Sequence, residues 1–152
     1  MQPLPHHYVV AATGDARSLR VSAHGLPDLA SAAPAEFDGP GDQWSPESLL
    51  CAAVASCFVL TFRAVARASR LEWRNLECNV EGLLERTDGV MQFTRLTTRA
   101  TLTVDSTQNP DLCRRALEKA EHGCLVANSL TAQRELRAEI RTVEVPRLTA
   151  NA

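Results

Sequence analysis

Apolar and polar positions change their spacing from one segment of this chain to the next, and the changes predict both strands and helices. Near the N-terminus, the apolar residues Leu19, Val21 and Ala23 alternate with polar ones after Gly14-Asp15. This pattern predicts a β-hairpin formed by His7–Thr13 and Arg17–Ala23. The following segment, residues 25–44, is rich in proline, glycine and aspartate, and we expect it to be mostly irregular.

A long helix is predicted to begin at Ser45 and to run to about Ser69. Ser45 suits the N-cap position, Pro46 the first helical position and Glu47 the first turn, where a carboxylate interacts favourably with the helix dipole. The first half of the helix, LLCAAVASCFVL, is apolar on every side, so we expect it to be enclosed all round. Its small residues allow close helix packing, and pairing two copies of this helix in a homodimer would supply the missing cover.

Two strands are predicted after this helix, over residues 76–84 and 91–104, with a turn at Thr87-Asp88-Gly89. Alternating residues of the first strand share one apolar face. In the second strand the apolar parity changes between Phe93 and Leu96, which predicts a β-bulge near Thr94-Arg95.

The last third of the chain predicts a second helix, a short CLVANSL turn or helix, and a final strand with Leu136 and Ile140 on one face. Asn109-Pro110-Asp111 begins the second helix and Gly123 ends it. Residues 1–152 are thus expected to form a single α+β domain, in which antiparallel strands cover an unusually apolar helix.

Charge and composition exclude several function classes. The formal net charge is −2, and the 16 basic residues form no stripe that would bind nucleic acid. The start of the chain lacks the basic and apolar regions of a secretion signal. The most apolar stretch, Leu49–Phe62, is shorter than the ~18 residues of a membrane span. We therefore expect a soluble cytoplasmic protein that contacts neither nucleic acid nor a membrane.

Five cysteines without a CxxC pair are the candidate chemistry, since this pattern does not resemble a disulfide scaffold. Cys57 lies in the middle of the apolar helix, where burial alone would make a thiol inert. It becomes a nucleophile only if another part of the fold supplies a cation. Arg17 shares strand parity with the apolar Leu19, and Glu47 could orient it; the alternative is that both residues have only structural roles.

Cys124 follows the glycine that ends the second helix. A position at a loop or helix start is expected to be accessible and mobile, as suits a thiol that must meet a partner. The alternative interpretation is that Cys124 is a capping hydrophobe.

The two cysteine segments resemble the OsmC/Ohr family of osmotically inducible and organic hydroperoxide resistance proteins. The resemblance is carried by SPESLLCAAVASCF around Cys57, by CLVANSL after Cys124, and by the loop FDGPGDQW before the helix. Where relatives have an arginine-rich turn this chain has GDARSLR, so Arg17 and Arg20 both remain candidates for the catalytic arginine. Leu125 and Ala127 stand where many relatives have proline and serine.

The resemblance implies an OsmC-like fold, in which strands wrap around central helices in an intertwined homodimer. It also implies a peroxidase that needs no cofactor and reduces organic hydroperoxides. Cys57 would be the peroxidatic thiolate, Cys124 the resolving thiol, Glu47 the carboxylate that orients Arg17, and a lipoyl-type dithiol the reductant. Phe58 and Leu50, together with the partner protomer, would form an apolar substrate pocket, and Cys51, Cys78 and Cys113 would only fill the core.

Three other interpretations are open. The same elements would suit a hot-dog acyl-thioesterase with Glu47 as its base, although that leaves the cysteine motifs unexplained. A stress-related or redox-sensing protein could keep the fold with little peroxidase turnover. A metal site formed by Cys113, His122 and Cys124 would lack a fourth ligand.

Overall fold

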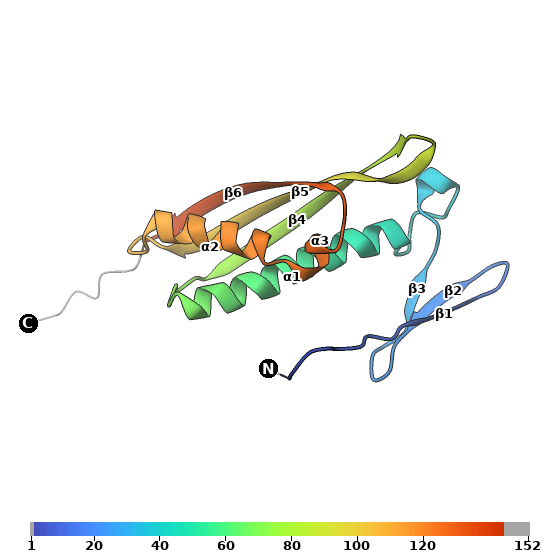
Figure 1. The fold of residues 1–152 in the computed structure, drawn as a ribbon, viewed down its shortest axis with the longest axis horizontal. Coiled ribbons are helices and arrows are strands. Elements are labelled where there is room, and N and C mark those ends of the chain that lie inside the picture. The colour runs from blue at the N-terminus through green and yellow to red at the C-terminus, as the bar shows by residue number, and fades with distance from the viewer. Residues whose placement is uncertain (1, 145–152) are drawn as a thin grey trace, which may run out of the picture. The chain divides into compact units, whose positions relative to one another are not determined.

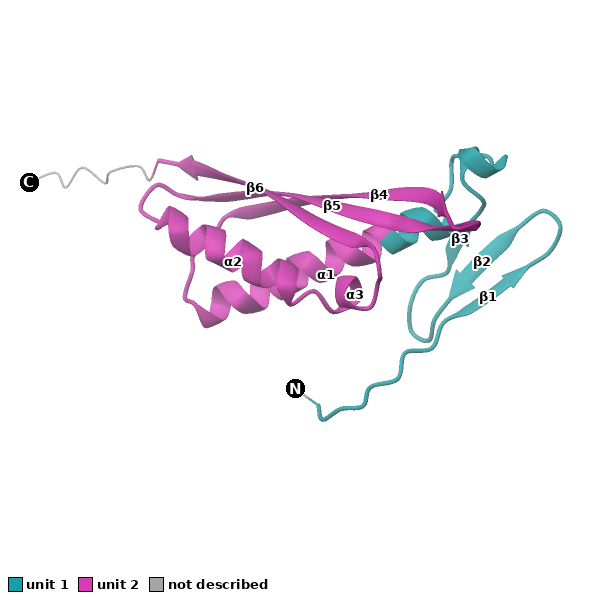
Figure 2. Ribbon diagram, turned by 45° about the horizontal axis from the view of Figure 1, so that its top comes forward, with its two compact units in different colours: residues 1–50 teal, residues 51–152 magenta. Residues whose placement is uncertain are grey.

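Ten elements follow one another along the chain in the computed structural model, which describes residues 2–144 (Figure 1). They belong to two compact units, residues 1–50 and residues 51–152 (Figure 2). The content of helices and strands confirms the predicted α+β class. That both units belong to a single domain stays a prediction.

The first unit contains a small antiparallel sheet of the strands β1 (Ala11–Gly14), β2 (Leu19–Ser22) and β3 (Leu29–Ser31), in that order. The predicted hairpin is confirmed, but its strands are shorter than expected. Arg17 lies in the turn rather than in a strand, and its backbone N–H donates to Asp15 Oδ1 at 2.8 Å. Strand parity therefore does not decide where its side chain points.

Residues 25–44 are mostly irregular, as predicted. They also include β3 and the short 3-10 helix η1 (Ala35–Phe37). β3 is ordered by its pairing with β2, for example between Ala30 and Arg20. Such pairing depends on a distant partner and leaves little local signal.

The helix α1 (Pro46–Ala68) begins where Ser45 and Pro46 predict. Ser45 Oγ accepts from the Ser48 N–H at 3.1 Å, and Ser48 Oγ accepts from the Ser45 N–H at 2.8 Å. These reciprocal bonds form a capping box with serine in the place of the usual glutamate. They satisfy two backbone donors that have no partner within the helix.

Only one stripe of α1 is buried, formed by residues four positions apart: Val54, Phe58, Phe62 and Ala66. The prediction that its first half is enclosed all round was therefore wrong for the single chain, in which Leu60 remains 56% exposed. The reason is that the other elements of the same chain pack against only one side of α1.

By length and composition α1 could also span a membrane, since an 18-residue window of it has a mean hydropathy of 2.1. Only 22% of that window is buried inside the protein. The predicted stretch Leu49–Phe62 is shorter than this window, so the whole helix, and not that stretch, has the length of a span. The buried stripe nevertheless packs against other elements of the protein core, as in the core helix of a soluble protein.

The second unit contains a sheet of β4 (Asn75–Thr87), β5 (Val90–Asp105) and β6 (Gln133–Val143), with β5 in the centre. β4 and β5 form the predicted hairpin, and its turn residues Asp88 and Gly89 both have positive φ. Leu83 pairs with Arg95 and Leu84 with Phe93. Thr94 is left without a partner, which confirms the predicted bulge.

The helices α2 (Pro110–His122) and α3 (Leu125–Asn128) connect β5 to β6. The Asn109 side chain caps α2 by accepting from the N–H groups of Asp111 and Leu112. β6 pairs with β5 in parallel. The prediction of a wholly antiparallel cover was therefore wrong, because the connection through α2 and α3 returns the chain to the end of the sheet where β5 began.

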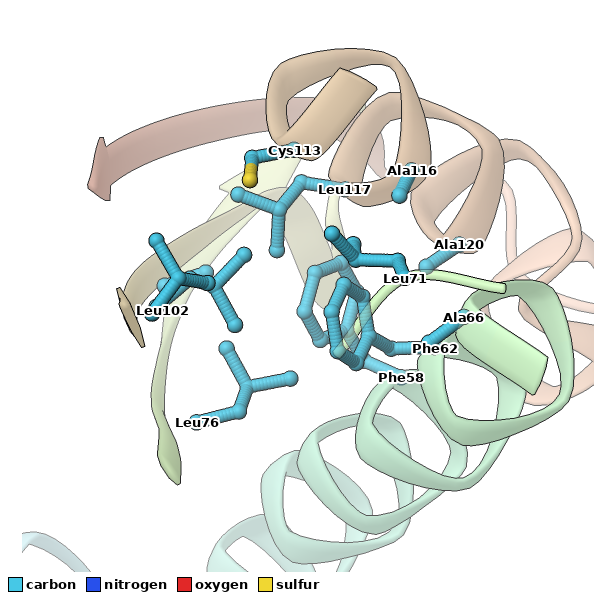
Figure 3. Packing of buried hydrophobic residues seen from close by; sticks show 12 residues of the cluster. Phe58, Phe62, Ala66, Leu71, Leu76, Leu102, Cys113, Ala116, Leu117 and Ala120 are labelled. Atoms are coloured by element: carbon cyan, nitrogen blue, oxygen red, sulfur yellow. The ribbon is translucent and has the colours of Figure 1, made fainter. Parts of the chain in front are cut away.

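The core of the second unit lies between its sheet and the helices α1 and α2 (Figure 3). Phe62 packs edge-on against Trp73, with ring centroids 5.3 Å apart. We refer to this group as the main cluster; its fully buried large side chains are Phe58, Phe62, Leu102, Val104, Cys113 and Leu117.

Gly82 allows a close approach between β4 and its neighbours. A Cβ atom at this position would lie 2.6 Å from the ring of Phe93 and 2.9 Å from the sulfur of Cys51. Such distances are far inside van der Waals contact, so only glycine fits here without displacing a neighbour.

Candidate active site

The second unit brings together the two cysteines that the sequence analysis singled out. Cys57 lies on α1, and Cys124 is the N-cap residue of α3. Both belong to a second group of packed residues, which we call the thiol cluster: Val54, Leu96, Cys124, Ala127 and Ala132, with Cys57, Val80, Phe93, Val126 and Leu130 against it. Both cysteines are free thiols.

Cys57 is half-buried, and its surroundings lower the pKa of its thiol. Burial by itself acts in the opposite direction and raises this pKa. Hydrogen bonds to the sulfur outweigh it, and they come from the N–H of Val126, the Cys124 thiol, the Thr61 hydroxyl and the N–H of Leu125. All four donors are neutral, so the thiolate here is stabilised by dipoles.

Cys124 has the opposite electrostatics. Its side chain is only 1% exposed, and burial is the main cause that raises the pKa of its thiol. The neighbouring Cys57 sulfur raises it further. The thiol proton can be shared between the Cys57 sulfur and the backbone oxygen of Val54, which lies 3.8 Å from Cys124 Sγ.

The prediction that Cys124 is accessible was wrong. A helix start is often exposed, but the side chain of Cys124 turns inward and packs with the buried Ala127 and Leu96. The thiol that would resolve an oxidised Cys57 therefore lies beside it already, on the buried side.

The sequence analysis missed the groups that lower the Cys57 pKa. Thr61 lies one turn after Cys57 on α1, a spacing that places the two side chains on the same face. Its methyl group faces Gly123, where a Cβ would lie 3.1 Å from Thr61 Cγ2. The i, i+4 spacing could have indicated Thr61, whereas the N–H groups of Leu125 and Val126 have no residue-type signature.

Glu47 and Arg17 belong to the first unit. Glu47 Oε2 is buried and has no hydrogen-bond partner among residues 2–144. A buried carboxylate oxygen without a partner is costly, so this position calls for a donor. Arg17 is exposed, and the described residues include no ion-pair partner for its guanidinium. Arg20 lies 3.4 Å from Asp28, in an exposed pair.

The other three cysteines lie where a packing role predicts. Burial raises the pKa of each thiol, and it raises that of Cys78 to about 11, with a further contribution from the nearby Cys124. Cys51 packs on Gly82 of β4, and Cys113 is fully buried in the main cluster. None of these three thiols has a set of hydrogen-bond donors like the one that lowers the pKa of Cys57.

One further expectation fails, and one alternative interpretation finds no support. Phe58 is 1% exposed within the main cluster, so it has no free surface with which to line a substrate pocket. The metal site of Cys113, His122 and Cys124 is not formed, because the two cysteines lie in different clusters and His122 is exposed. Within residues 2–144 no three His, Cys, Asp or Glu side chains are grouped to hold a metal ion.

Comparisons with known proteins bear on the family and the fold. The profile of the family described as OsmC-like protein matches residues 39–139, which include both Cys57 and Cys124. The chain is 29% identical over 109 residues to the uncharacterized protein YmaD of Bacillus subtilis, covering 70% of this chain and 73% of that protein.

Solved structures share the fold at low sequence identity. An organic hydroperoxide resistance protein OsmC from Legionella pneumophila is similar with a TM-score of 0.73 and 22% identity, over 91% of this chain and 99% of that one. An OsmC-like protein of unknown function from Vibrio cholerae gives 0.77 and 19%, over 90% and 99%. At these identities the likeness extends to the fold alone.

Proposed function

Because the chain belongs to the OsmC-like protein family, we propose that it is a peroxide-related stress protein acting as a thiol peroxidase on organic hydroperoxides. One observation carries the proposal. In a pair of neighbouring thiols, the pKa of the half-buried Cys57 is lowered while the pKa of the buried Cys124 is raised. That difference separates a nucleophile from a thiol held in reserve.

In the first step, the Cys57 thiolate attacks one oxygen of the hydroperoxide ROOH. A sulfur–oxygen bond forms, the oxygen–oxygen bond breaks, and the leaving alkoxide takes a proton to become the alcohol ROH. Cys57 is left as a sulfenic acid. The N–H groups of Leu125 and Val126 and the Thr61 hydroxyl keep the thiolate populated before the attack.

In the second step, the Cys124 sulfur attacks the sulfenic sulfur of Cys57. A disulfide forms, the sulfur–oxygen bond breaks, and the hydroxide combines with the Cys124 proton to leave as water. The balance is one ROOH and two thiols converted to ROH, water and one disulfide. A dithiol of the lipoyl type then restores both thiols by exchange, and no cofactor takes part.

We also propose catalytic roles for Arg17 and Glu47. The guanidinium would stabilise the charge that develops on the peroxide oxygens, and Glu47 would orient it through the carboxylate oxygen that lacks a partner. We further propose that the protein works in the cytoplasm as an intertwined homodimer. The exposed apolar side of α1, including Leu60, supports this assembly.

A second candidate function is a redox sensor with little turnover. It is favoured by the burial of Cys124, because an external dithiol can attack the disulfide only at the half-buried Cys57 sulfur unless the α3 segment moves. The replacement of proline and serine by Leu125 and Ala127 agrees with this alternative.

A peroxide-consumption assay separates the two candidates. Cumene hydroperoxide and hydrogen peroxide are compared with dihydrolipoamide as the electron donor. A peroxidase consumes many equivalents of cumene hydroperoxide and prefers it over hydrogen peroxide. A sensor consumes about one equivalent and stops as the disulfide, and unaltered thiols after either peroxide would exclude both functions.

A further inference from the structure

Asn128 ends the C-x-x-x-N segment that begins at Cys124, and the proposed chemistry gives it no role. It is the last residue of α3, and its side chain joins two other elements. Asn128 Nδ2 donates to the backbone oxygen of His122 at 3.1 Å, and Asn128 Oδ1 accepts from Arg134 Nη1 at 2.7 Å. Asn128 thus uses both ends of its amide to link α3 to the end of α2 and to β6.

Arg134 is held in turn by a carboxylate. Its Nε lies 3.2 Å from Glu121 Oε1, and the two side chains are only 27% and 15% exposed. A planar guanidinium can donate to a carboxylate and an amide oxygen at the same time in a fixed geometry. We call Asn128, Arg134 and Glu121 the clamp. The other ion pairs of β6, Arg137–Glu135 and Arg141–Glu139, join residues of one strand and are largely exposed.

A clamp is needed here because α3 is a single helical turn. Its only bond of the helical i+4 type runs from the Asn128 N–H to the Cys124 oxygen, at 2.9 Å. One isolated turn is unstable in water, so its geometry depends on outside contacts. Packing of Cys124 and Ala127 holds the buried side of the turn. The clamp holds its C-terminal end, which is otherwise exposed.

We propose that Asn128 and Arg134 are positioning residues that keep the N–H groups of Leu125 and Val126, and the Cys124 sulfur, on the Cys57 sulfur. The catalytic consequence of this positioning rests on the proposed function. The effect of Asn128 and Arg134 on the Cys57 thiol can be measured without peroxide. When the clamp is broken, α3 frays, Cys57 loses donors and its thiolate becomes scarcer. The distance between the two sulfurs is then no longer fixed, so disulfide formation slows as well.

The test measures alkylation of Cys57 by iodoacetamide as a function of pH, with each cysteine resolved by peptide mapping. In Asn128→Ala and Arg134→Ala, the rate at neutral pH should fall at least about threefold, and the profile should move to higher pH, because hydrogen bonds to a charged sulfur are lost. Asn128→Asp keeps the acceptor for Arg134 but loses the donor to His122, so its profile should lie between those of the wild type and Asn128→Ala. Arg137→Ala is the matched control and should behave as the wild type.

One more measurement and a second set of variants make the outcome decisive. Hydrogen exchange of the peptide that contains Leu125 and Val126 should be faster in the clamp variants, while exchange in the β4–β5 hairpin should not change. If either alanine variant fails to fold, Asn128→Asp and Arg134→Lys are compared with Arg137→Lys in its place. The proposal would be overturned if the folded clamp variants showed the same alkylation and hydrogen exchange as the wild type. It would also be overturned if the Arg137 control variant showed the same changes as the clamp variants. A clamp effect on alkylation in a protein that consumes no peroxide would support the clamp and reject the proposed function.

Discussion

Thr61 lies one turn after Cys57 on α1, where its hydroxyl helps to lower the pKa of the Cys57 thiol and its methyl group faces Gly123. A single side chain thereby contacts both the nucleophile and the residue that precedes Cys124. The hydroxyl and the methyl group have separable consequences, which isosteric substitutions can distinguish.

Thr61→Val keeps the shape of the side chain and removes the donor. Because hydrogen-bond donors stabilise the thiolate, removal of the Thr61 hydroxyl should raise the Cys57 pKa. As the pH is lowered, alkylation of Cys57 should therefore be lost at a higher pH in the variant than in the wild type. Below that pKa the rate should fall about tenfold for each pH unit. Thr61→Ser keeps the donor and should retain the wild-type pH profile. Equal profiles in Thr61→Val and the wild type would show that the hydroxyl does not act on the sulfur.

The two cysteines should differ sharply in their response to one equivalent of organic peroxide. In the wild type we expect one intramolecular Cys57–Cys124 disulfide, with Cys51, Cys78 and Cys113 still reduced. Cys124→Ser should react once and stop at a sulfenic or over-oxidised form, whereas Cys57→Ser should not react rapidly. Peptide mapping checks the pairing, and a dominant bridge that involves Cys51 or Cys113 would falsify the assignment.

Arg17 and Arg20 can be distinguished by substitution. Arg20 is already paired with Asp28, whereas the guanidinium of Arg17 has no ion-pair partner within residues 2–144. Arg17→Ala should slow peroxide consumption about 100-fold, the usual effect of removing a group that stabilises developing charge. Arg20→Ala should have a much smaller effect. If Arg20→Ala is the more damaging change, Arg20 is the catalytic arginine and the assignment to Arg17 is wrong.

Gly82→Ala should destabilise the second unit by about 1–3 kcal/mol, because the added methyl group overpacks the space shared by Phe93 and Cys51. Chemical denaturation measures the change in the free energy of unfolding. The same substitution in a Phe93→Leu background should cost less, since the ring that is closest to the new atom is gone. An equal cost in both backgrounds would place the strain elsewhere in β4.

The exposed apolar side of α1 should be covered by a second copy of the chain. Light scattering at low micromolar concentration should show a dimer. Leu60→Glu should shift it toward the monomer, because a charge would be buried in the interface without a partner. Lys119→Glu, an exposed change on α2, should leave the dimer intact. A stable monomer of the wild-type chain would contradict the assembly and the site that depends on it.

Local signals account for the features that were predicted correctly. Ser45 and Pro46 mark the start of α1, Asn109 caps α2, and the change of parity after Phe93 reveals the bulge at Thr94, since each depends on neighbouring residues. The parallel pairing of β6 and the added strand β3 depend on partners that are distant in the chain. They left no periodicity from which to predict them.

In the candidate site too, some features could be predicted from local sequence signals and others could not. The motif around Cys57 and the segment after Cys124 indicated the two thiols, and the fold brings them together. The sequence left open whether Cys124 is accessible or a capping hydrophobe, because a capping position is compatible with either an outward or an inward side chain. The N–H donors of Leu125 and Val126 belong to the backbone, so the identity of the side chains does not predict them.

The parallel pairing of β6 with β5 also imposes an order on folding. β4 and β5 can pair as soon as both have been synthesised, since their hairpin is local. Cys124 and α3, in contrast, lie on the crossover between β5 and β6, and contacts of such large sequence separation form late and slowly. A nascent chain that ends before β6 therefore carries Cys57 without the donors from α3. We therefore expect the lowered pKa of Cys57 to arise only after β6 has docked against β5.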